Sequence, residues 1–168
     1  MSKTKLNAVL VLMGSGSDHS VMAEAEKVLE EFGVSFETQV VSAPRDPVRC
    51  QQVAAGAAAR GVRVIIAGAG KAAHLAGVVA SHTLLPVIGV PLDAGMGGLD
   101  ALLSTVQMPA GVPVACMAVG KSGAVNAALL AVEILALNDT RLRRRLESYR
   151  HKIAAETLEK SRAIQRVK

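Results

Sequence analysis

Short apolar runs alternate along the chain with longer stretches in which apolar residues recur at helical spacing. A short continuous apolar run is typical of a strand that is buried on both faces of a parallel sheet. Such runs predict five strands, at 8–13, 34–41, 62–67, 86–90 and 114–119. The stretches between them predict one helix that ends near Phe32 and four further helices at 47–60, 72–82, 99–106 and 124–137. Strands that alternate with helices predict an α/β fold with right-handed crossovers and a doubly wound parallel sheet.

The length of 168 residues predicts a single domain over 1–168, with an α/β core at 7–138 and a basic C-terminal helix at 139–168. This last segment holds ten Lys and Arg against four Asp and Glu, so it carries a net charge of +6 while the remainder carries −1. Because the positive charge is confined to one helix, a solvated helix face is favoured over a nucleic-acid or membrane patch. Three aromatic residues are also too few to stack on bases.

Cysteine usage and hydropathy favour a reducing compartment. Cys50 and Cys116 match no metal or redox spacing, and no pair of histidines or carboxylates has the spacing of metal ligands. The first residues lead into the first predicted strand without a signal peptide, and no apolar run reaches the ~18 residues that span a bilayer. We therefore expect a cytoplasmic protein with no membrane segment and no metal site.

Ligands of doubly wound sheets bind at the carboxyl ends of the strands. The loops that follow the predicted strands lie at 14–18, 42–47, 68–75, 91–98 and 107–113. The first three loops are rich in Ser, Gly, Arg, Asp and His, which are the residue types that bind phosphate and sugar groups. The sequence therefore predicts a phosphate and sugar site formed by these three loops.

The first two loops carry the candidate phosphate ligands. The hydroxyl groups of Ser15, Ser17 and Ser42 could donate to phosphate oxygens. The guanidinium of Arg45 could bind two of those oxygens at once. The competing interpretation is helix capping together with a surface salt bridge. Asp18 could either accept from ribose hydroxyls or cap the helix that follows it.

The third loop carries Lys71 and His74 directly after two glycines. Gly68 and Gly70 stand between a strand-like run and an alanine-rich stretch, where backbone N–H groups can approach a ligand closely. For His74, a catalytic or ligand-orienting role competes with that of a buried structural histidine. The glycines loosely match a dinucleotide-binding fingerprint, but they follow the third predicted strand and not the first, which disfavours that cofactor.

Five segments in order carry a more specific pattern than any single loop. They are Met13-Gly14-Ser15-x-Ser17-Asp18, Val40-Val41-Ser42-Ala43-x-Arg45-x-Pro47, Ile65-Ile66-Ala67-Gly68-Ala69-Gly70-x-Ala72-Ala73-His74-Leu75, Val106-Gln107-Met108-Pro109-x-Gly111-x-Pro113-Val114 and Gly120-Lys121-x-Gly123-Ala124-x-Asn126-Ala127-Ala128-Leu129-Leu130. Together they resemble the PurE (AIR carboxylase) family of bacterial purine synthesis, the N5-carboxyaminoimidazole ribonucleotide mutases. They resemble the mutase type more than the animal-type carboxylase, which lacks this Gly-Ala-Gly and Ala-Ala-His arrangement.

The resemblance implies a three-layer, flavodoxin-like α/β domain that assembles as a homo-octamer, with the C-terminal helix packed on a neighbouring subunit. It implies a mutase that moves a carboxylate from the exocyclic nitrogen N5 to carbon C4 of an aminoimidazole ribonucleotide, through CO2 held in a closed pocket. No metal, nucleotide or organic cofactor is implied. The expected partner is the small-molecule ribonucleotide, with neither nucleic acid nor membrane.

The resemblance also assigns roles to individual residues. It places the substrate phosphate on Ser15, Ser42 and Arg45, and the ribose on Asp18. It encloses the base and the migrating carboxylate with the residues of the third loop, which are Gly68, Ala69, Gly70, His74 and Leu75.

The second loop departs from the family pattern, which is Ser-Ala-His-Arg-Thr-Pro with the histidine as proton shuttle. Here Pro44 takes the place of that histidine, Asp46 that of the threonine, and Lys71 that of a glycine in the third loop. Proline has no titratable group, so His74, Lys71 or Asp46 would have to move the proton. Two alternatives remain: a divergent paralogue that carboxylates or decarboxylates another heterocycle, and a catalytically inactive ribonucleotide-binding protein.

Overall fold

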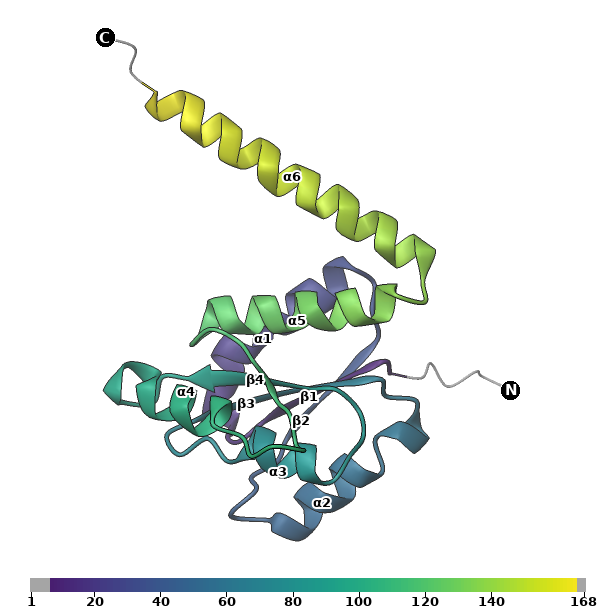
Figure 1. Ribbon diagram of the computed structural model, residues 1–168, viewed down its shortest axis with the longest axis vertical. Helices are drawn as coiled ribbons and strands as arrows, with labels where there is room; N and C mark the ends of the chain where they lie inside the picture. Colours follow the sequence, from purple (N-terminus) through teal and green to yellow (C-terminus); the bar gives the residue numbers. More distant parts are fainter. Residues whose placement is uncertain (1–6, 166–168) are drawn as a thin grey trace.

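The computed structural model describes residues 7–165 and contains one sheet of five parallel strands (Figure 1). The spatial order of the strands is β2-β1-β3-β4-β5, which is the flavodoxin-like order of a doubly wound sheet. The strands are β1 (Val9–Met13), β2 (Phe36–Val40), β3 (Val64–Gly70), β4 (Val87–Leu92) and β5 (Ala115–Cys116). The predicted fold class is therefore confirmed.

Helices cover both faces of the sheet, so the molecule has three layers (Figure 1). On one face lie α1 (His19–Glu31) and α5 (Lys121–Ala136). On the other face lie α2 (Pro47–Ala55), α3 (Leu75–Ser81) and α4 (Leu99–Val106). Successive residues of β1 alternate between the two cores, since side chains of a strand point to opposite faces. Both faces of β1 are therefore fully buried, as its unbroken apolar run predicts.

Most elements differ from their predicted bounds by a few residues, and the helix predicted at 47–60 ends at Ala55. Two further differences have local reasons. The helix predicted from 72 begins at Leu75, because Lys71 has a left-handed backbone (φ 56°) and the Ala73 N–H donates to the Lys71 carbonyl oxygen over 2.9 Å. These two features keep 71–74 out of helical geometry. The strand predicted at 114–119 shortens to Ala115–Cys116, since Pro91 of the neighbouring β4 has no N–H to extend the ladder.

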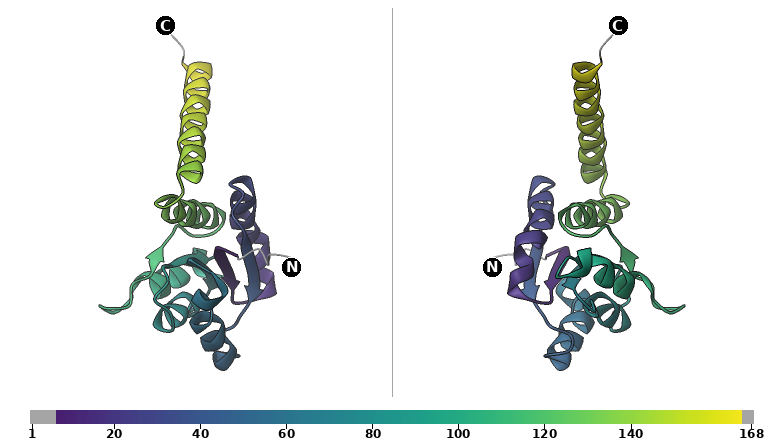
Figure 2. Two further views of the ribbon diagram at one scale, coloured as in Figure 1. Left: turned by 90° about the vertical axis from the view of Figure 1, so that its right-hand side faces the viewer. Right: turned by 90° about the vertical axis from the view of Figure 1, so that its left-hand side faces the viewer.

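The last helix, α6 (Thr140–Ile164), has an inner half that packs on the body and an outer half that extends away from it (Figures 1 and 2). Asp139 caps its first turn by accepting from the N–H groups of Arg141 and Leu142. Further along, the ring of Tyr149 meets that of Phe32 edge to face, with 5.4 Å between centroids. From residue 150 to residue 165 every side chain is exposed.

Candidate functional site

A cavity of about 550 Å³ opens at the carboxyl ends of β1 and β3, beside the loop that follows β2. The three loops that the sequence singles out form nearly all of its lining, and one residue after β4 completes it. The lining residues are Gly14, Ser15, Ser17, Asp18, Ser42, Ala43, Pro44, Arg45, Ala69, Gly70, Lys71, Ala72, Ala73, His74, Leu75 and Ala94. The structure thus brings together ten of the twelve predicted site residues and leaves out Asp46 and Gly68.

The first loop forms a compact capping turn. The Ser15 hydroxyl accepts from the Ser17 N–H over 3.4 Å and from the Ser17 hydroxyl over 2.9 Å. In return, the Asp18 carboxylate accepts from the Ser15 N–H over 2.9 Å, so that the two residues cap the turn reciprocally. The Asp18 carboxylate thus caps the turn at 16–18 but makes no capping bond to α1, the helix that follows it, so that expectation is wrong. Its carboxylate lines the cavity, and its contact with ribose stays a prediction.

The half-buried Asp18 carboxylate has an altered proton affinity. Burial raises the pKa of this carboxyl above its ordinary value of 3.8, because the charged form loses solvation. The hydrogen bond from the Ser15 N–H and the nearby Arg45 guanidinium act in the opposite direction and lower the pKa, but they do not outweigh the burial. The fold thus tolerates the negative charge of Asp18 at a cost in solvation.

The Arg45 side chain ties the second loop to the first. Its Nε donates to the Ser42 hydroxyl over 2.9 Å, and its Nη2 donates to the Gly14 carbonyl oxygen over 3.0 Å. These two bonds fix the plane of the guanidinium, while its other N–H groups remain available to a ligand. The serine hydroxyls and this oriented guanidinium can together bind a phosphate.

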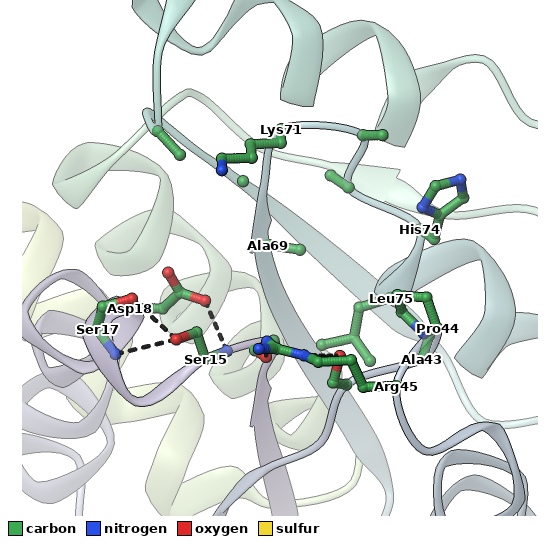
Figure 3. Close-up of a pocket in the computed structure, with 16 residues that line it drawn as sticks. Ser15, Ser17, Asp18, Ala43, Pro44, Arg45, Ala69, Lys71, His74 and Leu75 are labelled. Carbon is green, nitrogen blue, oxygen red and sulfur yellow. Dashed lines mark hydrogen bonds between the residues drawn. The ribbon is translucent and has the colours of Figure 1, made fainter.

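Asp46 is the one predicted catalytic residue outside the cavity lining. Its carboxylate accepts from the Arg49 N–H over 3.1 Å and caps α2, with Pro47 in the first helical turn. This capping bond gives Asp46 a structural role at the start of α2. Pro44, two residues earlier, does line the cavity, and Figure 3 shows it on the same side as His74 and Leu75.

Two glycines of the third loop are packed so closely against neighbouring residues that neither position has room for a side chain. A Cβ on Gly68 would overlap the thioether of Met22, which explains why Gly68 supports the cavity without lining it. A Cβ on Gly70 would lie 2.8 Å from that of Ala94, so the loops after β3 and β4 are in direct contact. At both positions the close approach of neighbouring protein groups requires glycine, whether or not a ligand also contacts the loop.

His74 precedes the first turn of α3 with its side chain exposed, which rules out the buried structural histidine. It caps no backbone N–H, and Figure 3 shows its ring on the opposite side of the cavity from Asp18. The cavity therefore has four charged or titratable side chains in its lining, which are Asp18, Arg45, Lys71 and His74.

Sequence reasoning missed the small residues that shape the cavity. Ala43, Ala72, Ala73 and Ala94 carry no polar group, and their only signal is their position inside or beside the predicted loops. The predicted ligand loop at 107–113 contributes no lining residue. Within 7–165 no cluster of three metal-ligating side chains occurs, and none of the helices there is long and apolar enough to cross a membrane.

Comparison with known proteins gives concordant matches. A model of the AIR carboxylase family matches residues 8–156. Among curated relatives, the N5-carboxyaminoimidazole ribonucleotide mutase of Pyrococcus abyssi is 53% identical over 151 residues, covering 89% of this chain and 86% of that protein. The mutase of Mycobacterium tuberculosis H37Rv is 52% identical over 158 residues, covering 94% and 90%. The crystal structure of Treponema denticola PurE aligns with a TM-score of 0.84 at 27% identity, covering 94% of this chain and 98% of that one.

Proposed function

This chain belongs to the AIR carboxylase family, and from that premise we propose that it is an N5-carboxyaminoimidazole ribonucleotide mutase of purine biosynthesis. The proposal rests above all on one observation: the three loop motifs that resemble the family line a single cavity at the carboxyl edge of the sheet. The relatives about 50% identical to this chain carry the name of this mutase, which is an isomerase. The reaction moves a carboxylate from N5 to C4 of the ribonucleotide.

The phosphate subsite consists of the first two loops. Ser15, Ser17 and Ser42 supply hydroxyl groups, and Arg45 supplies an oriented cation between the two loops. In this assignment Asp18 accepts from the ribose hydroxyls with the oxygen that does not bind the Ser15 N–H. Ala69, Gly70, His74 and Leu75 enclose the base, while Gly68 supports them from beneath.

The proton chemistry is the step that this chain must perform differently from its family. When the N5–carboxylate bond breaks, CO2 leaves and N5 takes up a proton. When C4 then attacks the CO2, C4 loses a proton, so one group can serve both transfers. Pro44 cannot do so, and Asp46 is engaged as a helix cap outside the lining. Of the two remaining candidates, Lys71 and His74, we assign the proton transfer to His74, because an imidazole exchanges protons near neutral pH.

The proposed assembly is a cytoplasmic homo-octamer in which α6 packs on a neighbouring subunit. Every residue of α6 from 151 to 164 is exposed, and the large apolar side chains among them are Ile153 (41%), Leu158 (51%) and Ile164 (77%). Exposed apolar side chains on a helix that leaves the body are suited to burial against another copy.

The direct test incubates the purified protein with N5-carboxyaminoimidazole ribonucleotide and follows the C4-carboxylated product. We expect turnover in the native chain, loss of at least about a hundredfold in His74→Asn, and a higher rate in Pro44→His, because an added proton shuttle commonly contributes ~10²–10⁴ in rate. Binding without turnover in every variant would contradict the proposal and favour an inactive ribonucleotide-binding protein.

A second candidate function is specifically favoured by Pro44, which removes a titratable group from the cavity wall. A related enzyme that carboxylates or decarboxylates another heterocycle would need the phosphate subsite but not the family's proton shuttle. Tight binding of ribose 5-phosphate together with no measurable affinity for the aminoimidazole ribonucleotide would support that function over the mutase.

A further inference from the structure

Lys71 is a second cation in the cavity, in addition to Arg45, and it forms no ion pair within the described part of the chain. Arg45 is engaged by the Ser42 hydroxyl and the Gly14 carbonyl oxygen. Among residues 7–165, the ion pairs are His19–Glu26, Lys27–Glu24, Arg143–Glu147 and Arg150–Glu133, and none includes Lys71. The ammonium group of Lys71 is therefore exposed at the cavity and has no partner from within that part of the chain.

The two cations lie at opposite ends of the cavity. Figure 3 shows Lys71 at the top of the view and Arg45 at the bottom, with the Ala69 methyl group between them. A single small anion at Arg45 therefore leaves Lys71 without a counter-charge. A ligand with an anionic group at each end would satisfy both cations.

The backbone holds Lys71 in a conformation that disfavours any residue with a Cβ. Its φ of 56° lies in the left-handed region, which costs free energy for residues other than glycine. The contact of Gly70 with the Ala94 loop and the bond from the Ala73 N–H to the Lys71 carbonyl oxygen fix the loop on both sides. This backbone holds the Lys71 side chain at the cavity wall.

We propose that Lys71 binds the carboxylate of the substrate while Arg45 and the serine hydroxyls bind its phosphate. This inference rests on the proposed function and specifies how this chain recognises a carboxylated ribonucleotide. Lys71 acts as a protonated binding residue, since an ammonium group attracts a carboxylate only in its charged form. The assignment leaves the proton transfer to His74 and makes Lys71 responsible for discrimination between carboxylated and uncarboxylated ribonucleotides.

The test compares two ligands that differ only in the carboxylate: aminoimidazole ribonucleotide and its C4-carboxylated form. Isothermal titration calorimetry would measure both dissociation constants for the native chain and for Lys71→Met, Lys71→Gly and Lys71→Arg. We expect Lys71→Met and Lys71→Gly to weaken binding of the carboxylated ligand about tenfold and of the uncarboxylated ligand less than about twofold. Lys71→Arg should recover most of the affinity, because it restores the cation.

Met96→Gly is the matched control for the backbone. Met96 also has a φ of 56°, but its exposed side chain does not line the cavity, so its replacement should leave both affinities unchanged. An equal loss for both ligands in Lys71→Met would overturn the proposal, since the lysine would then bind the phosphate. An unchanged affinity for the carboxylated ligand would overturn it as well. If the native chain bound neither ligand, the proposed function would fail together with this inference.

Discussion

At the residue scale, the site shows how burial and hydrogen bonding compete at a single carboxyl group. Asp18 accepts from the Ser15 N–H and lies near Arg45, and both interactions favour its ionised form. Burial nevertheless dominates and raises the pKa of Asp18 above 3.8. A carboxylate whose solvation is reduced in this way can gain more from ribose hydroxyls than a fully solvated one.

The raised pKa of Asp18 predicts a particular dependence of stability on pH. The folded chain binds this proton more tightly than the unfolded chain, so the stabilisation is complete below 3.8 and is lost as pH rises through the raised pKa. Asp18→Asn abolishes the titration. The free energy of unfolding of the native chain minus that of Asp18→Asn should therefore decrease as pH rises from about 3 to about 7.

Urea denaturation across that pH range measures this difference. Asp46→Asn serves as the matched control, because Asp46 also caps a helix but lies in an exposed position outside the cavity. A difference that increases with pH for Asp18→Asn would show that the ionised carboxylate is stabilised by the fold, contrary to the expectation.

Much of the site could be predicted at this scale, because polar residues after buried strands must meet at one edge of the sheet. What could not be predicted is the direction of each side chain. Asp46 stands in the right loop but turns toward the N-terminus of α2, and Gly68 faces Met22 from within β3. The pattern of residue types predicts which loops form the site, but the packing of the folded chain decides which side chains of those loops reach the ligand.

At the element scale, the strand and helix assignments follow from hydropathy, and the deviations from them follow from the backbone. The prediction of α4 at 99–106 is confirmed to the residue, since its apolar spacing has no competing turn. Helix α3 starts later than predicted because of the left-handed Lys71, and no hydropathy pattern encodes that backbone angle. Local φ values therefore limit sequence-based prediction more than the periodicity does.

The docking of α6 on α1 provides a prediction at this same scale. The Arg145 guanidinium donates to the Glu31 carbonyl oxygen over 2.8 Å, at the end of α1 where helix carbonyls lack partners within the helix. Arg145→Ala should lower the free energy of unfolding by about 1 kcal/mol, since it removes a cation and a hydrogen bond from a helix C-terminus.

Arg144→Ala is the matched control for that change, because Arg144 is an exposed neighbour on the same helix, whereas the bond to the Glu31 carbonyl oxygen comes from Arg145. Urea denaturation of both variants separates the specific bond from the loss of one positive charge. Equal effects in the two variants would show that the bond to Glu31 contributes nothing.

At the scale of the whole molecule, the cavity and the outer half of α6 belong to different regions. The cavity opens at the carboxyl edge of the sheet, whereas α6 begins beside Ala8 and Ser35 at its amino edge. The basic charge of the chain is concentrated on this helix, away from the ligand loops. In an assembly formed through α6, the α6 helix of a subunit would therefore not cover the entrance to the cavity of that same subunit.

The proposed assembly predicts that charge on the exposed apolar side chains of α6 will dissociate the protein. Replacement of both Ile153 and Leu158 by Arg should convert the octamer to smaller species in light scattering, because buried cations without partners are unfavourable at an interface. The circular dichroism spectrum should stay unchanged, since these side chains are exposed within their own chain. Lys160→Glu is the control on the same helix, and an unaltered mass of the double variant would refute the assignment.

The edge-to-face contact of Tyr149 with Phe32 has a spectroscopic consequence. The sequence contains one tyrosine and no tryptophan, so all tyrosine fluorescence of the protein originates at the junction of α6 with the body. A change in tyrosine emission reports the separation of Tyr149 from Phe32, while circular dichroism reports the helix and sheet content of the whole chain. The difference between the two melting curves would therefore reveal whether the helix detaches before the sheet unfolds.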